Sequence, residues 1–429
     1  MSAVRRTWDT GDLQRRLFRV LDLAEQVITH LAYNGYVDTV DSHNTVRPEK
    51  IIAETAFLLW VASHVKDCPG ISARVDNLAR QLIPYARSKR MLLHICLEPT
   101  HAMECAQAHI LLGQLGFIDT EFDAAVAASL ESQAAQGRER PPHRVLEQLW
   151  FDDLRSSSTP GAGHSGNLVA KQTLLYLPLD LLHGGREDIY AFTHALMYTS
   201  RFQKSPLKWP KPPGEIRATA ACLLARCLDD EDYDLCGELL LSWPLTRGRW
   251  NAAATFVFHV LAHVEDVAGF LPTPATRLNK LDTLTGLARR RYMLATAYHT
   301  IYVMGVLCAS ILGLDHHPPL RIPVHSANSG ASKCILEQIE SGDSRPHWVE
   351  IFIGLRDAER DAIAGLLFDL AVVRSTRLND FDRLLQILKT GHRFGLTASP
   401  AASQCAELLN RMTEFARITN RLLPAVIAS

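Results

Sequence analysis

Helical periodicity runs along almost the whole chain, and no other feature of the sequence limits its fold so strongly. Apolar residues recur at spacings of three and four, which places them on one face of a helix. Alternation typical of strands is nearly absent, and 319–326 (PLRIPVHS) is the one short candidate. The pattern predicts an all-α protein with helices at 11–34, 49–66, 71–87, 100–115, 121–135, 143–156, 186–202, 214–229, 231–242, 250–268, 286–312, 331–341, 346–373, 379–393 and 400–424.

The helices have similar lengths and mostly short connections, which favours stacked antiparallel helix pairs, as in an α/α toroid or a superhelix. Stretches rich in Pro, Gly and Ser predict loops at 156–167, 205–214 and 313–330. We expect an N-terminal helical subdomain (1–90), a central helical region with a pocket (91–330) and C-terminal helices (331–429). The apolar face within 346–424 either closes the fold or pairs with a second subunit to form a homodimer.

Charge balance, apolar segments and cysteine spacing indicate the partners and the compartment of the protein. The 45 basic and 46 acidic residues nearly cancel, so no net field attracts nucleic acid or an anionic membrane. The N-terminal residues lack the apolar segment of a secretory signal, and no run of about 18 apolar residues predicts a spanning helix. The nine cysteines are scattered without a CxxC pair, which is typical of reduced thiols. We therefore expect a cytoplasmic protein without nucleic-acid or membrane partners.

The segment GGREDIYAFTHALMYTSRF, which begins at Gly184, carries an unusual stripe of polar side chains. Glu187, Tyr190, His194 and Tyr198 follow one another at helical spacing and so share one face. A core helix would present Leu, Ile and Val there, and a surface helix would present Lys and Glu. Glu187 and the neighbouring Asp188 are also the acids expected in the first turn of a helix, where they complement its dipole. The deeper residues of the stripe predict the wall of a pocket.

Two further apolar helices carry histidines in register. ATAYHTIYVMGVLCA places Thr296, His299 and Tyr302 at spacings of three. FVFHVLAHVEDVAGF places a His259–His263 pair at i, i+4, followed by Glu265 and Asp266. Such a pair can chelate zinc, but the glutamate of an HExxH helix is missing, which argues against a metalloprotease.

Other motifs carry less weight. Glu98 and His101 form one ExxH spacing near Cys105 and His109, whereas a di-iron bundle needs two. GAGHSGN lacks the last glycine of a nucleophile elbow, and the HGG at 183–185 lacks the α/β sheet of an esterase. The acids of CLDDEDYDLCGELL resemble the magnesium ligands of helical terpene cyclases. Without the second motif of that family, we interpret Asp229, Asp230 and Asp234 as a solvated turn between helices.

Four segments resemble an uncharacterised family of helical actinobacterial proteins, often encoded beside genes of specialised metabolism. They are REDIYAFTHALMYTSRF, LATAYHTIYVMGVLCA, ERPPHRVLEQLW (139–150) and HVEDVAGFLP (263–272), so that the resemblance covers roughly residues 90–312. No reaction is assigned to that family. The resemblance implies a biosynthetic setting and favours as site residues His109, His143, Glu187, Asp188, His194, Glu265, Asp266 and His299.

These features predict an enzyme of specialised metabolism that acts on a small molecule or modified peptide, of the lyase, cyclase or metal-dependent type. We expect catalytic roles for Glu187, Asp188, His194, Tyr198, Glu265, Asp266 and His299, and substrate contacts from Tyr190, Tyr302, His109 and His143. Histidines and carboxylates in an apolar setting can work as general acid and base, or hold one Zn or Fe ion through His194, His299 and Glu187. Metal-free chemistry is favoured, because no spacing is a recognised metal signature. The alternative is a non-catalytic helical scaffold or peptide-binding partner of a biosynthetic enzyme.

Overall fold

In the computed structural model, the described residues are 10–31, 48–156, 162–204, 206–324, 330–339 and 346–427. Within them the chain is helical and contains no strand, which confirms the all-α prediction. The arrangement as an α/α toroid or superhelix is not confirmed. The strand candidate 319–326 is not a strand where it is described, and its last two residues lie outside the described part.

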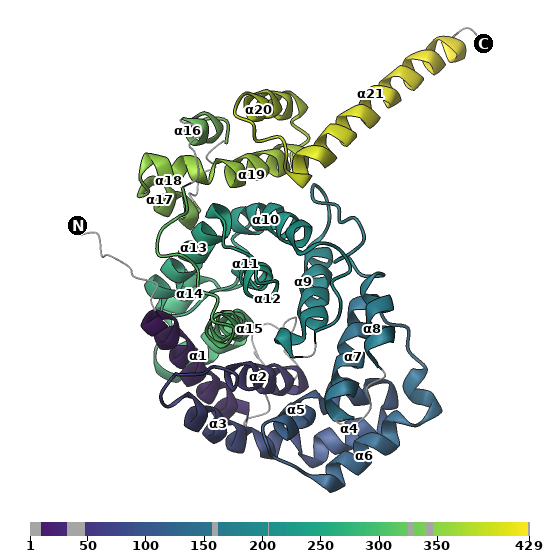
Figure 1. The fold of residues 1–429 in the computed structure, drawn as a ribbon, viewed down its shortest axis with the longest axis vertical. Coiled ribbons are helices and arrows are strands. Elements are labelled where there is room, and N and C mark those ends of the chain that lie inside the picture. The colour runs from purple at the N-terminus through teal and green to yellow at the C-terminus, as the bar shows by residue number, and fades with distance from the viewer. Residues whose placement is uncertain are drawn as a thin grey trace.

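The helix α15 (Gly286–Gly313) is the centre of the fold (Figure 1). It packs against α1 (Thr10–Leu31), α2 (Pro48–Ala62) and α11 (Tyr233–Leu240). Glycine at 305 allows this packing, because a Cβ atom there would lie 2.6 Å from Val20 and 2.8 Å from Leu58. Among the described residues, α15 is the one helix long and apolar enough to cross a membrane, but 83% of its most apolar window is buried inside the protein.

Further helices surround this centre, as Figure 1 shows. The α10 (Pro213–Asp229) and α13 (Ala252–Ala268) helices pack on α11, and the short α12 (Ser242–Leu245) follows α11 directly. The α9 helix (Arg186–Ser200) lies between α11 and α7 (Pro142–Arg155). Beyond them lie α3 (Ile71–Ala86), α4 (Lys89–Leu97), α5 (Ala102–Gln114), α6 (Thr120–Leu130), α8 (Ala162–Ala170), α14 (Leu278–Thr283) and the 3₁₀ turns Pro99–His101, Gln133–Gln136 and Arg201–Gln203.

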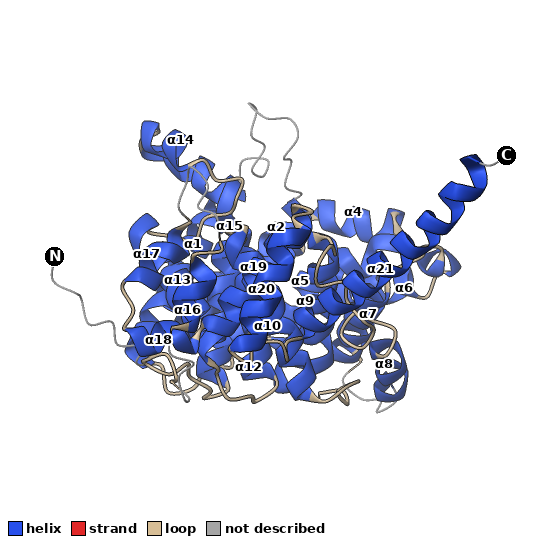
Figure 2. Ribbon diagram, turned by 90° about the horizontal axis from the view of Figure 1, so that it is seen from above, coloured by secondary structure: helices blue, strands red, loops and turns tan. Residues whose placement is uncertain are grey.

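The C-terminal helices stack on α10. The expected helix at 346–373 is three helices, α17 (His347–Ile353), α18 (Asp357–Ala362) and α19 (Ala364–Arg377). Because α19 buries its apolar face against α10, α16 (Ala331–Leu336) and α20 (Phe381–Arg393), this face closes the fold. The α21 helix (Pro400–Ile427) extends away from the body (Figures 1 and 2). A homodimer through these helices remains a prediction.

Of two expectations about the chain before α9, the loop at 156–167 needs correction, and the glycine turn with an acidic cap is supported. The predicted loop 156–167 is in part helical, because α8 begins at Ala162; residues 157–161 lie outside the described part. The Gly184–Gly185 turn before α9 requires glycine, since a Cβ atom at Gly184 would lie 2.3 Å from the carbonyl oxygen of Asp180. Asp188 then accepts a hydrogen bond from the Gly185 amide at 2.7 Å and caps the helix.

A cluster of aromatic rings fastens α2 to α7 and to the end of α9. The ring centroids of Trp60 and Trp150 are 5.2 Å apart, and the Phe202 ring is 5.3 Å from Phe57 and 5.9 Å from Trp60. Such edge-to-face contacts each add about 0.5–1.5 kcal/mol beyond burial. The cluster therefore sets the spacing between α2 and α9, both of which carry residues of the site described next.

Candidate active site

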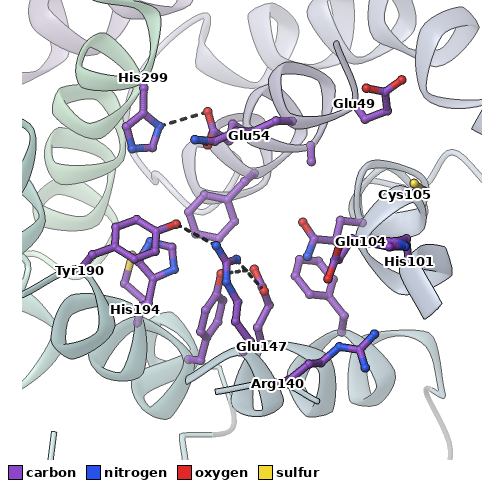
Figure 3. A pocket seen from close by; sticks show the side chains of 18 of the residues that line it. Glu49, Glu54, His101, Glu104, Cys105, Arg140, Glu147, Tyr190, His194 and His299 are labelled. Carbon is purple, nitrogen blue, oxygen red and sulfur yellow. Dashed lines mark hydrogen bonds and ion pairs between the residues drawn. The ribbon is translucent and has the colours of Figure 1, made fainter. Parts of the chain in front are cut away.

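A cavity of about 880 Å³ opens between seven helices that come from distant parts of the sequence. Its size suits a small organic ligand, for which pockets measure roughly 300–1,000 Å³. Figure 3 shows His299, Glu54, Tyr190 and His194 on one side and His101, Glu104 and Cys105 on the other. The polar lining residues come from α2 (Glu49, Lys50, Glu54), α4 (Arg90, His94), α5 and the turn before it (Glu98, His101, Glu104, Cys105, Gln107), α7 and the segment before it (Arg138, Glu139, Arg140, Arg144, Glu147), α9 (Tyr190, His194, Tyr198), α11 (Glu238) and α15 (His299, Tyr302).

At one end lies a group that we call the buried cluster, made of Glu54, Asp234, Glu238 and His299. Nδ1 of His299 is 3.1 Å from Oε2 of Glu54. On the other side of the same ring, Nε2 is 3.4 Å from Oδ1 of Asp234 and 3.7 Å from Oε1 of Glu238. Asp234 and Glu238 are only 4% and 3% exposed, so this end of the cavity is shielded from bulk solvent.

Charges within the buried cluster shift its pKa values. Burial by itself lowers the pKa of His299, but the carboxylates of Asp234 and Glu54 outweigh burial and hold this pKa well above its usual value. Burial raises the pKa of Glu238, and the nearby Asp234 carboxylate adds to that shift. For Glu54, the positive charges of His299 and Lys50 outweigh burial and lower the pKa.

His194 is the second imidazole at this end and has the opposite electrostatics. Its Nε2 is 3.8 Å from the same Oε1 of Glu238, and its ring packs against Tyr190 at a tilt of 33°, with centroids 3.7 Å apart. The buried Nδ1 of His194 has no hydrogen-bond partner among the described residues. Burial and the charge of Arg144 lower the pKa of His194 well below its usual value. A neutral imidazole with an unused nitrogen can accept a proton from a ligand.

Arg144 and Glu147 of α7 form a hydrogen-bond network in the middle of the cavity. The Arg144 guanidinium donates to Glu147 Oε2 at 2.8 Å and to the Tyr190 hydroxyl at 3.2 Å. Tyr198 donates its O–H to the other Glu147 oxygen at 2.6 Å. Arg144 thereby holds a positive charge beside the adjoining rings of Tyr190 and His194, where it can pair with an anionic group.

The rest of the cavity, which we call the outer half, is lined by more exposed charges. Arg90 pairs with Glu49 at 2.8 Å, and His94 lies 3.1 Å from Glu98. The Arg90 side chain is 61% exposed, and the His94 side chain is 36% exposed. Exposed pairs of this kind contribute little to stability, about 0–1 kcal/mol each. The outer half can therefore exchange its internal pairs for contacts with a ligand at small cost.

The structure brings five of the predicted site residues together in this cavity: His194, Tyr198, His299, Tyr190 and Tyr302. A sixth, His143, lies behind the lining, with its ring 6.3 Å from the His194 ring. The stripe deduced from helical spacing thus faces the cavity from its second residue onward.

The other predicted site residues lie elsewhere. Glu187 and Asp188 are exposed at the start of α9, so Glu187 does not join His194 and His299 as a metal ligand. Glu265 and Asp266 on α13 pair with Arg16 of α1. His109 is buried between helices, where it accepts from Arg87 at 3.0 Å and lies 2.8 Å from Asp123. Asp188, Glu265, Asp266 and His109 each have a structural partner away from the cavity, which explains their polarity.

Three residues of the buried cluster are not among the site residues predicted from the sequence. Glu54 lies between Ala53 and Thr55 in α2, beyond the charged first turn, and Asp234 and Glu238 stand one turn apart in the apolar run YDLCGELL. A carboxylate pair at i, i+4 among Leu and Cys is the signal that could have identified them. The interpretation of Asp234 as part of a solvated turn is wrong, because Asp234 is buried. Asp229 and Asp230 do lie at the end of α10, paired with Arg374 and Arg377 of α19.

Comparison with known proteins places the cavity within a family domain. A family model described as a domain of unknown function (DUF6895) matches residues 19–309. No curated protein and no solved structure gives a significant match. All the residues that line the cavity lie within the matched range, whereas the C-terminal helices α16–α21 lie outside it.

Proposed function

The chain belongs to this family of unknown function, and from the geometry of its cavity we propose that it is an enzyme using histidine and carboxylate chemistry. The substrate is a small molecule or a modified peptide segment, and the reaction is of the lyase or cyclase type. The actinobacterial and specialised-metabolite setting implied by the sequence resemblance belongs to the same proposal.

One observation carries the proposal. Two imidazoles from different helices, His194 and His299, flank a single buried oxygen of Glu238 at the end of the cavity, at 3.8 and 3.7 Å. Proton transfer by positioned imidazole and carboxylate groups contributes roughly 10²- to 10⁴-fold to enzymatic rates. His194 lines a cavity large enough for a ligand and keeps a buried nitrogen without a hydrogen-bond partner among the described residues, which supports contact with a ligand.

The residues fit distinct roles in such a reaction. Arg144 and Tyr190 would orient an anionic or polar part of the substrate, because both present donors beside the His194 ring. His194 would remove a proton from the substrate, and a group of the buried cluster would deliver one to the departing or closing atom. Elimination and cyclisation need no oxidant or reductant, because one proton leaves the substrate and one returns.

Untargeted mass spectrometry of a metabolite extract, incubated with the purified protein, tests this function. We expect the wild type to convert at least one mass feature and His194→Gln to lose about 100-fold or more of the rate while keeping its melting temperature. The matched control is His109→Gln, which changes a buried histidine outside the cavity and should retain conversion.

Conversion that persists in His194→Gln would overturn the assignment of His194. The absence of any feature converted by the wild type would instead favour the alternative of a non-catalytic scaffold or peptide-binding partner.

A further inference from the structure

Three donor atoms of the buried cluster lie farther apart than hydrogen-bonded groups and close to the spacing of ligands around an ion. Nε2 of His299 is 3.4 Å from Oδ1 of Asp234 and 3.7 Å from Oε1 of Glu238, and a set of donors from these three residues lies within 4.8 Å of one another. Hydrogen bonds between these groups would be about 2.7–2.9 Å long. Two ligands that share an ion at about 2.1 Å, at tetrahedral or octahedral angles, lie about 3.0–3.5 Å apart.

Each of the three residues is also contacted by another group through its second polar atom. Asp234 uses Oδ2 to accept from Arg186 at 2.7 Å, and Glu238 uses Oε2 to accept from Thr193. His299 directs Nδ1 to Glu54 at 3.1 Å. A histidine that ligates a metal usually gives its other ring nitrogen to a carboxylate in this way, which fixes the tautomer and the orientation of the ring. The atoms that remain, Oδ1, Oε1 and Nε2, are those that converge, and Nε2 would lose its proton when an ion binds.

An independent observation is the state of Oδ1 of Asp234. This oxygen is buried, on a side chain only 5% exposed, and has no hydrogen-bond partner among the described residues. Leaving such a charged acceptor unsatisfied costs roughly 1–3 kcal/mol or more. A cation at the convergence point would satisfy it.

We propose that Asp234, Glu238 and His299 bind one divalent transition-metal ion at the buried end of the cavity. Two carboxylate oxygens and one imidazole nitrogen form a mixed donor set that suits Mn²⁺, Fe²⁺ or Zn²⁺ better than Ca²⁺ or Cu⁺. The three residues leave other coordination positions open, as catalytic sites do.

The metal site adds a cofactor to the proposed function. A catalytic role of the ion rests on that function, whereas binding of the ion does not. The ion would stabilise the departing or closing oxygen as a Lewis acid, in place of proton delivery by the buried cluster, and His194, 3.8 Å from Oε1 of Glu238, would still remove the substrate proton. Glu54 is then a positioning residue that orients His299. Binding of the ion itself is measured without substrate, so failure of this inference and failure of the proposed enzyme activity can be told apart.

The test uses the full chain, treated with EDTA and titrated with MnCl₂, with free Mn²⁺ followed by electron paramagnetic resonance. Mn²⁺ is a suitable probe because the nine cysteines, which prefer softer ions, do not compete for it. We expect saturation at one Mn²⁺ per chain in the wild type, loss of that site in Glu238→Gln and His299→Gln, and an affinity about 10–100-fold weaker in Glu54→Gln.

The matched control is His94→Gln, which removes the imidazole beside Glu49 and Glu98 in the outer half of the same cavity. It should bind Mn²⁺ as the wild type does. Saturating Mn²⁺ should raise the melting temperature of the wild type and of His94→Gln but not of Glu238→Gln.

Absence of saturable Mn²⁺ binding in the wild type, or unchanged binding in both Glu238→Gln and His299→Gln, would overturn the metal site. Loss of binding in His94→Gln alone would overturn its location. If Glu238→Gln and His299→Gln do not fold, Glu54→Gln decides the question, because an unchanged affinity in that variant contradicts the arrangement.

Discussion

Arg16 on α1 and Glu265 on α13 form an ion pair that is almost completely buried, with side chains 5% and 2% exposed. The same guanidinium donates to Asp266 at 3.0 Å and contacts the carbonyl oxygen of Ala262. The acidic pair that the sequence analysis assigned to catalysis thus fastens the first helix to the body of the fold.

We predict that Arg16→Met lowers the free energy of unfolding by about 3–5 kcal/mol, because it leaves the Glu265 carboxylate buried without its partner. Urea denaturation measures this loss. Arg15→Met is the matched control: Arg15 pairs with Asp12 at a position 71% exposed, and its loss should cost less than about 1 kcal/mol. Equal effects of the two substitutions would contradict the structural role of the buried pair.

A second prediction concerns pH. Asp369 is buried, accepts from Cys222 Sγ at 3.3 Å, and has its pKa raised by burial from 3.8 to about 6. Between these values the folded protein holds a proton that the unfolded chain releases, so the free energy of unfolding falls as pH rises from about 4 to 6. Asp369→Asn should remove this slope and stabilise the protein at pH 8 by at most about 3 kcal/mol.

Urea denaturation at pH 4.5, 6 and 8 follows this effect. Asp361→Asn gives the opposite sign, because hydrogen bonds from Ser332 and Gly330 outweigh burial and lower the pKa of Asp361. Its stabilisation is present above the unfolded pKa of 3.8 and is lost only below it, so Asp361→Asn should destabilise by a similar amount at pH 4.5, 6 and 8. A flat difference between wild type and Asp369→Asn over this range would refute the raised pKa.

The two buried tyrosine hydroxyls of the cavity should differ in their contribution to stability. Tyr198 donates to the Glu147 carboxylate at 2.6 Å, whereas the Tyr302 hydroxyl is hydrogen-bonded to Thr55 at 2.9 Å. A hydrogen bond to a charged group contributes about 1.5–3 kcal/mol and a neutral one about 0.5–1.5 kcal/mol. Tyr198→Phe should therefore destabilise more than Tyr302→Phe in thermal unfolding, and the reverse order would count against this view of the Glu147 network.

Close packing of α15 leads to the last prediction. In Gly305→Ala the added methyl group meets Val20 and Leu58, so α15 must move away from α1 and α2, at a cost of about 1–3 kcal/mol. Gly113→Ala in α5 has open space around its Cβ position and should stabilise the protein by about 0.5–1 kcal/mol. The difference in melting temperature between these variants measures the effect, and similar melting temperatures would show that the helices repack freely.

Features that depend on local spacing could be predicted from the sequence. The all-α class follows from apolar residues at every third or fourth position, and several helix ends coincide with Pro or Gly, as at Pro48, Pro142 and Gly313. The stripe of Tyr190, His194 and Tyr198 also follows from the helical repeat, because residues on one face of one helix must point the same way. Helix 346–373 was predicted as continuous because its breaks, at Gly354 and Ile363, lie in a run without proline.

By itself, then, the sequence determined the helices and the faces on which histidine and tyrosine stand. Only the tertiary structure decided which acids those histidines meet. Glu265 and Glu238 both lie on apolar helices, yet Glu265 meets Arg16, 249 positions away, whereas Glu238 meets His194 and His299. The physical reason is that helix periodicity is set within a few residues, while the partner of a buried charge is set by which helix faces pack together, and that depends on side-chain shape along the whole chain.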